Sequence, residues 1–251
     1  MSGHSKWSSI KHKKGAADVK RGKLFSKLAR AIIVAAKEGG PDPANNLALQ
    51  NAVDKARSYS MPKDNIERAI ARGAGEGPDS ANFETVVYEG YGPEGVAVLV
   101  EALTDNRNRT ASEVRHAFAR HGGALGATGA VAWQFERRGV VLVPAEGADE
   151  EELFLAAADA GADDVSRDGD VFEVTSAPES LAAVRDAIGA AGFAVDSYEL
   201  AMIPKTTVSV DDETKAKSVM RLIDSLEDND DVQDVYANFD IPEQVLEAVA
   251  S

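Results

Sequence analysis

The first third of the chain carries apolar residues at every third or fourth position. This spacing predicts three amphipathic helices, near residues 20–39, 45–59 and 62–73. Gly39-Gly40-Pro41 ends the first, and Pro62 stands in the first turn of the third, which Gly73 ends. The apolar positions are Leu24, Leu28, Ile32 and Ala35, then Leu47, Leu49, Val53 and Ala56, then Ile66, Ala69 and Ile70. Short connections between three such helices predict a small helical bundle.

A Gly-rich linker at residues 73–80 is followed by alternating strands and helices. Residues 84–91 and 96–103 have strand composition, and Thr110 with Glu113 has the spacing of a capping box that opens a helix. A strand is predicted at 131–135. From 140 to 202 the predicted order is strand, helix, strand, strand, helix, strand, with elements at 140–143, 149–160, 164–166, 171–174, 178–191 and 194–202. That order is the ferredoxin-like βαββαβ unit.

The segments on either side of this unit predict the same order when joined. Strand, helix and strand occupy 96–135, and strand, helix and strand follow at 205–210, 213–226 and 232–237. We therefore predict an α+β fold with an N-terminal helical bundle and two ferredoxin-like α+β domains, one inserted in the other. The predicted domains are 1–76, a discontinuous domain of 80–136 with 204–240, and an inserted domain of 137–203.

Charge divides the chain at the same linker. Residues 1–75 hold 15 Lys and Arg against 6 Asp and Glu, whereas residues 76–251 hold 12 against 36. We call residues 1–75 the basic head and residues 76–251 the acidic body. This asymmetry indicates that the basic end of the chain contacts a polyanion. The alternative is a lysine-rich tail that only keeps the protein soluble.

Several classes of chemistry have no support in the sequence. The absence of cysteine removes disulfides, thiol nucleophiles and thiolate metal sites, and the four histidines are scattered. Acidic runs at 149–152 and 227–231 are expected to be helix caps and solvated faces. We predict no enzyme activity, no catalytic group, no cofactor, no metal and no small-molecule substrate.

The first apolar run, residues 31–36, is too short for a signal peptide or a membrane span, and with the absence of cysteine we expect a cytoplasmic protein with no membrane partner. We also expect a monomer. A mitochondrial transit peptide is the weaker alternative.

The basic block at residues 5–30 has the residue types of a nucleic-acid interface. An aromatic able to stack on bases is embedded among cations able to pair with phosphate. The candidate nucleic-acid-binding residues are Lys6, Trp7, Lys11, His12, Lys13, Lys14, Lys20, Arg21, Lys23, Lys27 and Arg30. Lysines outnumber base-reading amides, which favours contact with the backbone over sequence reading. The competing interpretation packs Trp7 under the helix and leaves the lysines solvated.

Residues 104–110 form a second candidate site, at the connection between a predicted strand and the helix that follows it. Arg107 and Arg109 stand beside free backbone N–H groups, which suits an anion. Ordinary turn and capping chemistry selects the same residue types, so both interpretations stay open. For the Gly-rich stretch 121–129 we favour a structural role.

Four stretches of the chain resemble one protein family. They are Gly3-His4-Ser5-Lys6-Trp7 with Ile10-Lys11-His12-Lys13-Lys14, then 60–66, 88–93 and 103–110. In these stretches the chain is similar to the YebC/PmpR family, which has a mitochondrial relative that activates translation of cytochrome c oxidase subunit I.

The resemblance implies a three-domain, cytoplasmic, non-enzymatic protein. Its members have been described as transcriptional regulators that bind DNA, and also as ribosome-associated factors that act in translation and relieve stalling at proline-rich stretches. Three hypotheses follow: a DNA-binding regulator, a ribosome-associated factor that holds rRNA or tRNA, and an enzyme that uses the Arg107 and Arg109 turn.

Overall fold

The computed structural model describes residues 18–75, 83–242 and 244–245, with the side chains of 18–21 left out of the description. These residues fall into two compact units. One comprises 18–75, 83–130 and 217–235, and the other comprises 131–216 with 236–245. The three predicted domain boundaries stay a prediction.

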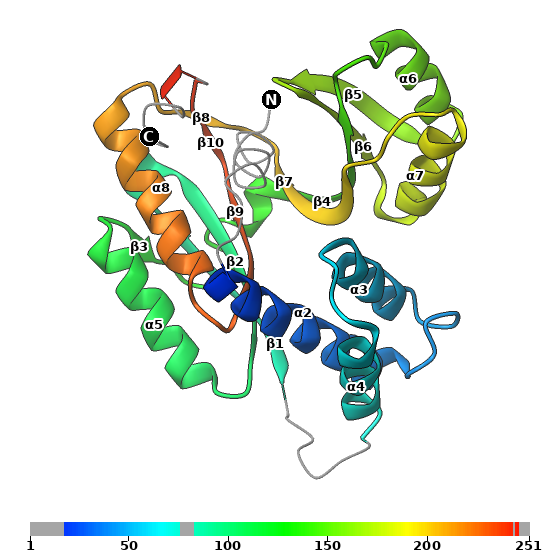
Figure 1. The fold of residues 1–251 in the computed structure, drawn as a ribbon. Coiled ribbons are helices and arrows are strands. Elements are labelled where there is room, and N and C mark those ends of the chain that lie inside the picture. Colours follow the sequence, from blue (N-terminus) through cyan, green and yellow to red (C-terminus); the bar gives the residue numbers. More distant parts are fainter. Residues whose placement is uncertain (1–17, 76–82, 243, 246–251) are drawn as a thin grey trace. The chain divides into compact units, whose positions relative to one another are not determined.

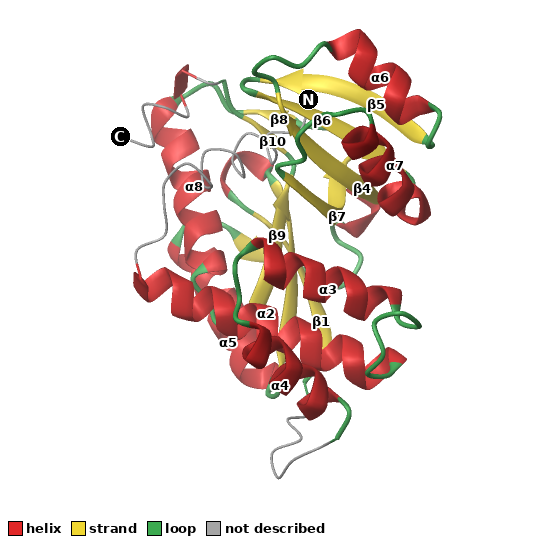
Figure 2. Ribbon diagram, turned by 45° about the vertical axis from the view of Figure 1, so that its right-hand side comes forward, coloured by secondary structure: helices red, strands yellow, loops and turns green. Residues whose placement is uncertain are grey.

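The first unit begins with the three predicted helices (Figure 2). They are α2 (Asp18–Gly39), α3 (Leu47–Ser58) and α4 (Lys63–Gly73). Asn46 caps α3 by accepting the N–H of Leu49 at 3.1 Å. α2 packs against both other helices, and the apolar positions predicted from the sequence, apart from Leu47, form a single core with Leu28, Ile32 and Leu49 among its buried members. Leu47 was predicted to face this core but is 60% exposed in the first turn of α3.

A four-stranded sheet completes this unit, in the order β3-β1-β2-β9. The helices α5 and α8 lie on one of its faces (Figure 1). Its elements are β1 (Glu84–Tyr91), the 3₁₀ turn η1 (Pro93–Gly95), β2 (Ala97–Thr104), α5 (Arg107–Arg120), β3 (Ala124–Leu125), α8 (Glu213–Glu227) and β9 (Val232–Ala237). Buried Glu89 accepts the N–H of Gly129 at 2.7 Å, and its own carbonyl accepts that of Gly126. These bonds give the Gly-rich stretch a structural role.

The second unit contains the ferredoxin-like sheet, in the order β5-β6-β4-β7 with antiparallel pairing throughout. This is the predicted βαββαβ arrangement, and the α+β class is confirmed. Its elements are β4 (Phe135–Pro144), α6 (Glu150–Ala158), β5 (Ala162–Asp168), β6 (Val171–Ser176), η3 (Pro178–Ser180), α7 (Leu181–Ala190) and β7 (Ser197–Pro204). Side chains of Val141, Leu153, Phe172 and Ile188 are in its core.

Three details of the predicted order are wrong. The predicted strand at 131–135 is instead the 3₁₀ turn η2 (Ala132–Gln134), in which the N–H of Gln134 donates to the carbonyl of Val131 at 2.9 Å. That turn rotates Trp133 outward, leaving it 66% exposed while Val131 and Phe135 are buried.

The second detail concerns the predicted strand at 205–210. It shortens to β8 (Val208–Ser209), which pairs with β10 (Phe239–Asp240) in a separate sheet. In the predicted order the strand at 205–210 would lie beside β2, but β1 occupies that position. A hairpin between neighbouring strands costs less loop-closure entropy than pairing across an inserted domain.

The third detail is the capping box. α5 begins at Arg107, with Asn106 as its cap, and Thr110 lies inside the helix.

Gly73 sits at the crossing of α4 with α2, where a side chain has no room. A Cβ at this position would lie 2.5 Å from the carbonyl oxygen of Ile33 and 2.7 Å from the Cβ of Ala36. We expect Gly73→Ala to lower the free energy of unfolding by about 1–3 kcal/mol, because the helices must move apart. Gly22→Ala on α2 is the control, since a Cβ there meets open space. It should raise stability by about 0.5–1 kcal/mol in the same urea titration. Equal effects of the two substitutions would contradict the close approach at Gly73.

Glu173 on β6 is a buried carboxyl, and burial raises its pKa to about 7, with Asp168 and Asp164 adding to the rise. Because this folded pKa lies above the ordinary value of 4.5, the folded state binds the extra proton, and stability falls as the pH rises toward and through 7. Glu173→Gln should therefore raise the free energy of unfolding by up to about 3 kcal/mol above pH 8 and change it little at pH 5. Urea unfolding at both pH values measures this, with exposed Glu179→Gln as control. A gain independent of pH would contradict it.

Candidate nucleic-acid interface

The predicted nucleic-acid-binding residues are described only in part. Lys20 and Arg21 belong to the first turns of α2, but only their backbone is described. Lys23, Lys27 and Arg30 are described in full. The other six, Lys6, Trp7, Lys11, His12, Lys13 and Lys14, lie outside the described residues.

The three described cations form one stripe on α2, spaced at i, i+4 and i+7. We call Lys23, Lys27 and Arg30 the basic stripe. This spacing places side chains on one side of a helix, while Leu28 and Ile32 are buried in the helical core. The sequence therefore keeps the helix packed through one face and presents charge on another.

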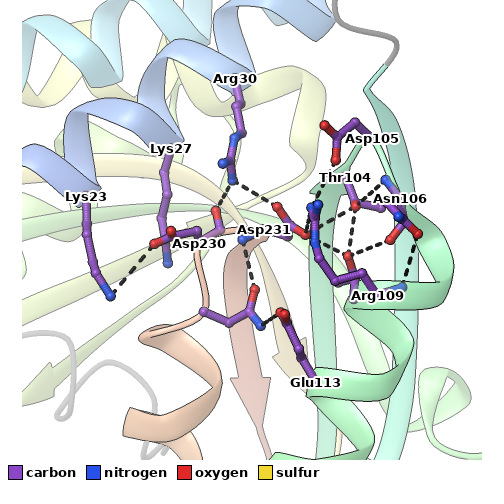
Figure 3. A network of polar contacts seen from close by, with 12 residues as sticks. Lys23, Lys27, Arg30, Thr104, Asp105, Asn106, Arg109, Glu113, Asp230 and Asp231 are labelled. Atoms are coloured by element: carbon purple, nitrogen blue, oxygen red, sulfur yellow. Dashed lines mark hydrogen bonds and ion pairs between the residues drawn. The ribbon is translucent and has the colours of Figure 1, made fainter.

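All three cations contact residues 227–231, which we call the acidic loop (Figure 3). The Lys23 ammonium donates to the carbonyl of Asp228 at 3.2 Å and lies 3.7 Å from a carboxylate oxygen of Asp230. The Lys27 ammonium donates to the carbonyl of Glu227 at 2.6 Å. Arg30 donates to the carbonyl of Asp230 and, at 3.2 Å, to a carboxylate oxygen of Asp231.

The acidic loop attracts cations for two reasons. It follows the C-terminal end of α8, where the last carbonyls have no partner within the helix and carry negative partial charge. It also contributes the carboxylates of Glu227, Asp228, Asp230 and Asp231. Lysine and arginine side chains satisfy both kinds of oxygen.

Asp231 is the centre of this network. Its side chain is only 5% exposed, and one carboxylate oxygen accepts from Arg109 at 2.7 Å, from Thr110 at 2.7 Å and from Thr104 at 3.2 Å. The other oxygen accepts from Arg30, whose guanidinium also stacks over the ring of Phe83 at 5.5 Å. One carboxylate thus joins α2, α5 and β2 at the start of β9.

Burial alone would raise the pKa of Asp231. The hydrogen bonds from Arg109 and Thr110, with the charges of Arg109 and Arg30, outweigh burial and hold that pKa below its usual value. The same bonds raise the pKa of Arg109, first through Asp231 and then through Asp105. Asp231 and Arg109 therefore stabilise each other's charged forms.

The second predicted site, the turn with Arg107 and Arg109, is occupied by the chain's own carboxylates. Arg109 lies 2.9 Å from Asp105 as well as 2.7 Å from Asp231, and Arg107 lies 3.6 Å from Glu84. The N–H of Arg109 donates to the capping side chain of Asn106. An external anion would have to compete with these groups, which favours the capping interpretation. The anion site itself stays a prediction.

A surface hollow of about 470 Å³ opens beside Arg30, Arg109 and the acidic loop. Carboxylates and cations both line it, so it offers an anionic small molecule no net attraction. Among the described residues, no group of three or more Asp, Glu or His is arranged to hold a metal ion. No helix in that part of the chain is both long and apolar enough to cross a membrane.

Family models match nearly the whole chain. The model for the TACO1/YebC N-terminal domain matches residues 5–76, and the model for the second and third domains matches residues 83–239. The chain belongs to the TACO1/YebC family. The resemblance found in the N-terminal signature and the three later stretches is thereby confirmed.

Relatives from distant bacteria match this TACO1/YebC chain along its full length. A protein of Rubrobacter xylanophilus is 58% identical over 250 residues, covering 100% of both chains, and one of Thermobifida fusca is 53% identical with the same coverage. Both are named probable transcriptional regulatory proteins. The crystal structure of a conserved hypothetical protein from Aquifex aeolicus matches with a TM-score of 0.82 at 49% identity, covering 91% of this chain and 94% of that one.

Sequence reasoning missed the acidic loop as a partner of the basic stripe. The run of four acidic residues in 227–231 was expected to be a solvated helix end, and its pairing with residues two hundred positions earlier follows from the fold. The available signal was charge complementarity between two short runs of opposite sign. That signal does not say which of several acidic runs is the partner.

The buried carboxylate predicts a stability effect. Asp231→Asn removes the charge that Arg30 and Arg109 share, so it should lower the free energy of unfolding by about 2–4 kcal/mol at pH 7. Because the folded pKa is lowered, this contribution is present above pH 3.8 and is lost as the pH falls below it. Urea titrations at several pH values measure the difference.

The matched control for that experiment is the neighbouring Asp230→Asn, whose side chain is 65% exposed. Removing an exposed partner should cost less than about 1 kcal/mol. If both variants lose the same stability, Asp231 is not the centre of the network.

Proposed function

We propose that this chain is a non-enzymatic regulator of transcription that binds DNA through its basic N-terminal segment, residues 5–30. The observation that carries the proposal is the full-length similarity to family members named probable transcriptional regulatory proteins, at up to 58% identity in the matches above. The basic head on an acidic body supports it, because only the head attracts phosphate. In this proposal the protein acts in the cytoplasm as a monomer, without a cofactor or a small-molecule substrate.

A second candidate function is translation, with rRNA or tRNA as the polyanion. One feature favours it. The basic block holds nine Lys or Arg and no Asn or Gln, so it is suited to phosphate and lacks the amide side chains that read adenine edges in a major groove. RNA recognition by shape needs no base-reading helix.

Binding through the head predicts a strong salt dependence. With about six phosphate contacts, the logarithm of the binding constant should fall with the logarithm of salt concentration at a slope near −4 to −5. Replacing Lys11, Lys13 and Lys14 with Gln should reduce the magnitude of that slope by about 2 to 3 and weaken binding to all sequences alike. Fluorescence anisotropy over a salt series measures both.

The control carries the same loss of charge elsewhere, at exposed Lys37, Lys63 and Lys217. We call the protein with Lys11, Lys13 and Lys14 replaced by Gln the head variant. If it binds nucleic acid as tightly as the parent, or if the control loses as much affinity, the basic head is not the binding surface.

Sedimentation separates the two candidate functions. Lysate containing the tagged protein is run through a sucrose gradient with and without ribonuclease, for the parent and for the head variant. Migration with ribosomal subunits that the head variant loses would favour translation. Protein that stays at the top of the gradient, yet binds one DNA fragment in preference to a scrambled competitor, would favour transcription.

A further inference from the structure

The basic stripe already contacts an acidic segment of the same chain in this structure. Each of its three cations donates to an oxygen of the acidic loop, Lys23 and Lys27 to backbone carbonyls and Arg30 to a carboxylate as well, and these are the donors that a phosphate would use. The side chains of the basic stripe, which point toward the acidic loop in Figure 3, are also among the predicted nucleic-acid contacts.

We propose that the acidic loop, residues 227–231, is an internal competitor that occupies the basic stripe in the free protein and yields its exposed end to nucleic acid. This inference rests on the proposed binding of nucleic acid by the N-terminal segment. It adds a regulatory contact to that function, because the affinity then depends on an equilibrium within the protein.

The contacts are graded along the stripe, so one end is released before the other. At the Lys23 end, the lysine side chain is 49% exposed, the side chain of its partner Asp230 is 65% exposed, and the ammonium lies 3.7 Å from a carboxylate oxygen of Asp230. Exposed pairs of this kind contribute little to stability, and a polyanion with many phosphates readily replaces them.

The opposite end of the stripe is held firmly. Arg30 is only 21% exposed, and its partner Asp231 is 5% exposed and also binds Arg109 and Thr110. Removing Arg30 from this carboxylate would leave a buried charge with fewer partners, which is costly. Arg30 therefore stays with the loop, and exchange is confined to Lys23 and the neighbouring Lys27.

A displaced loop also affects what binds. Its carboxylates remain near the stripe because Asp231 anchors them, so they repel any phosphate that approaches. A short or weakly bound polyanion cannot overcome this repulsion, whereas one that also engages the rest of the basic block can. The acidic loop thus lowers nonspecific binding more than it lowers binding to a full target.

The test is a double-mutant cycle on Lys23 and Asp230. Binding of a short DNA duplex and of an RNA hairpin is measured by anisotropy over a salt series for the parent, Asp230→Asn, Lys23→Gln and the double variant. Asp196→Asn, an exposed acidic position in the other compact unit, controls for the change in net charge.

We expect Asp230→Asn to bind about two- to fivefold more tightly at low salt, because it releases one exposed ion pair. Its salt slope should steepen by about 0.7 to 0.9, the contribution of one further phosphate contact. Both gains should disappear in the Lys23→Gln background and should be absent in Asp196→Asn.

Two results would overturn the inference while leaving the proposed function intact. They are a parent that binds with the expected salt slope while Asp230→Asn matches Asp196→Asn, or a gain that persists without Lys23. Failure of every variant to bind either nucleic acid would overturn the proposed function and the inference with it. A parent that binds weakly beside an Asp230→Asn variant that binds well would support both.

Discussion

A single buried carboxylate joins most of the first compact unit. Asp231 follows α8 and precedes β9, and it accepts hydrogen bonds from Arg30 on α2, from Arg109 and Thr110 on α5, and from Thr104 on β2. Burying an ionised carboxylate is costly unless charged donors surround it. The lowered pKa of Asp231 shows that the donors outweigh the burial. The helical bundle and the sheet of this unit are therefore joined by charge, through Arg30 on α2 and the carboxylate that precedes β9.

Local pattern predicted most of the fold because most of the fold is determined locally. Apolar spacing with Gly39, Pro62 and Gly73 defined α2, α3 and α4 to within a few residues, and alternation of strands and helices defined the ferredoxin-like order of the second unit. The errors occurred where a distant partner decides. β1, and not β8, pairs with β2. Thr110 was predicted to take part in a helix cap because its actual partner, Asp231, lies 121 residues away in the sequence.

The candidate site was predictable in composition but not in connection. The residue types alone identified the basic block. The family model for the N-terminal domain matches residues 5–76, which include this block and its signature. Nothing in the sequence pattern joined Lys27 to Glu227, because a helical face shows only that a partner exists. Similarly, Arg107 and Arg109 have the side chains of an anion site. In the structure both pair with carboxylates of the same chain, those of Glu84, Asp105 and Asp231.

The charge asymmetry of this TACO1/YebC chain therefore acts at two ranges. Over the whole chain, an acidic body and a basic head carry net charges of opposite sign, and their long-range field weakens beyond about 10 Å at ordinary ionic strength. At contact range, the opposite charges meet within one unit, where Lys23, Lys27 and Arg30 bind the end of α8. Contact pairs survive salt better than the long-range field because buried charges are screened less. Rising salt thus weakens the long-range field first and leaves the internal pairing at Asp231 in place, so the fold does not depend on the contact with nucleic acid that we propose for the basic block.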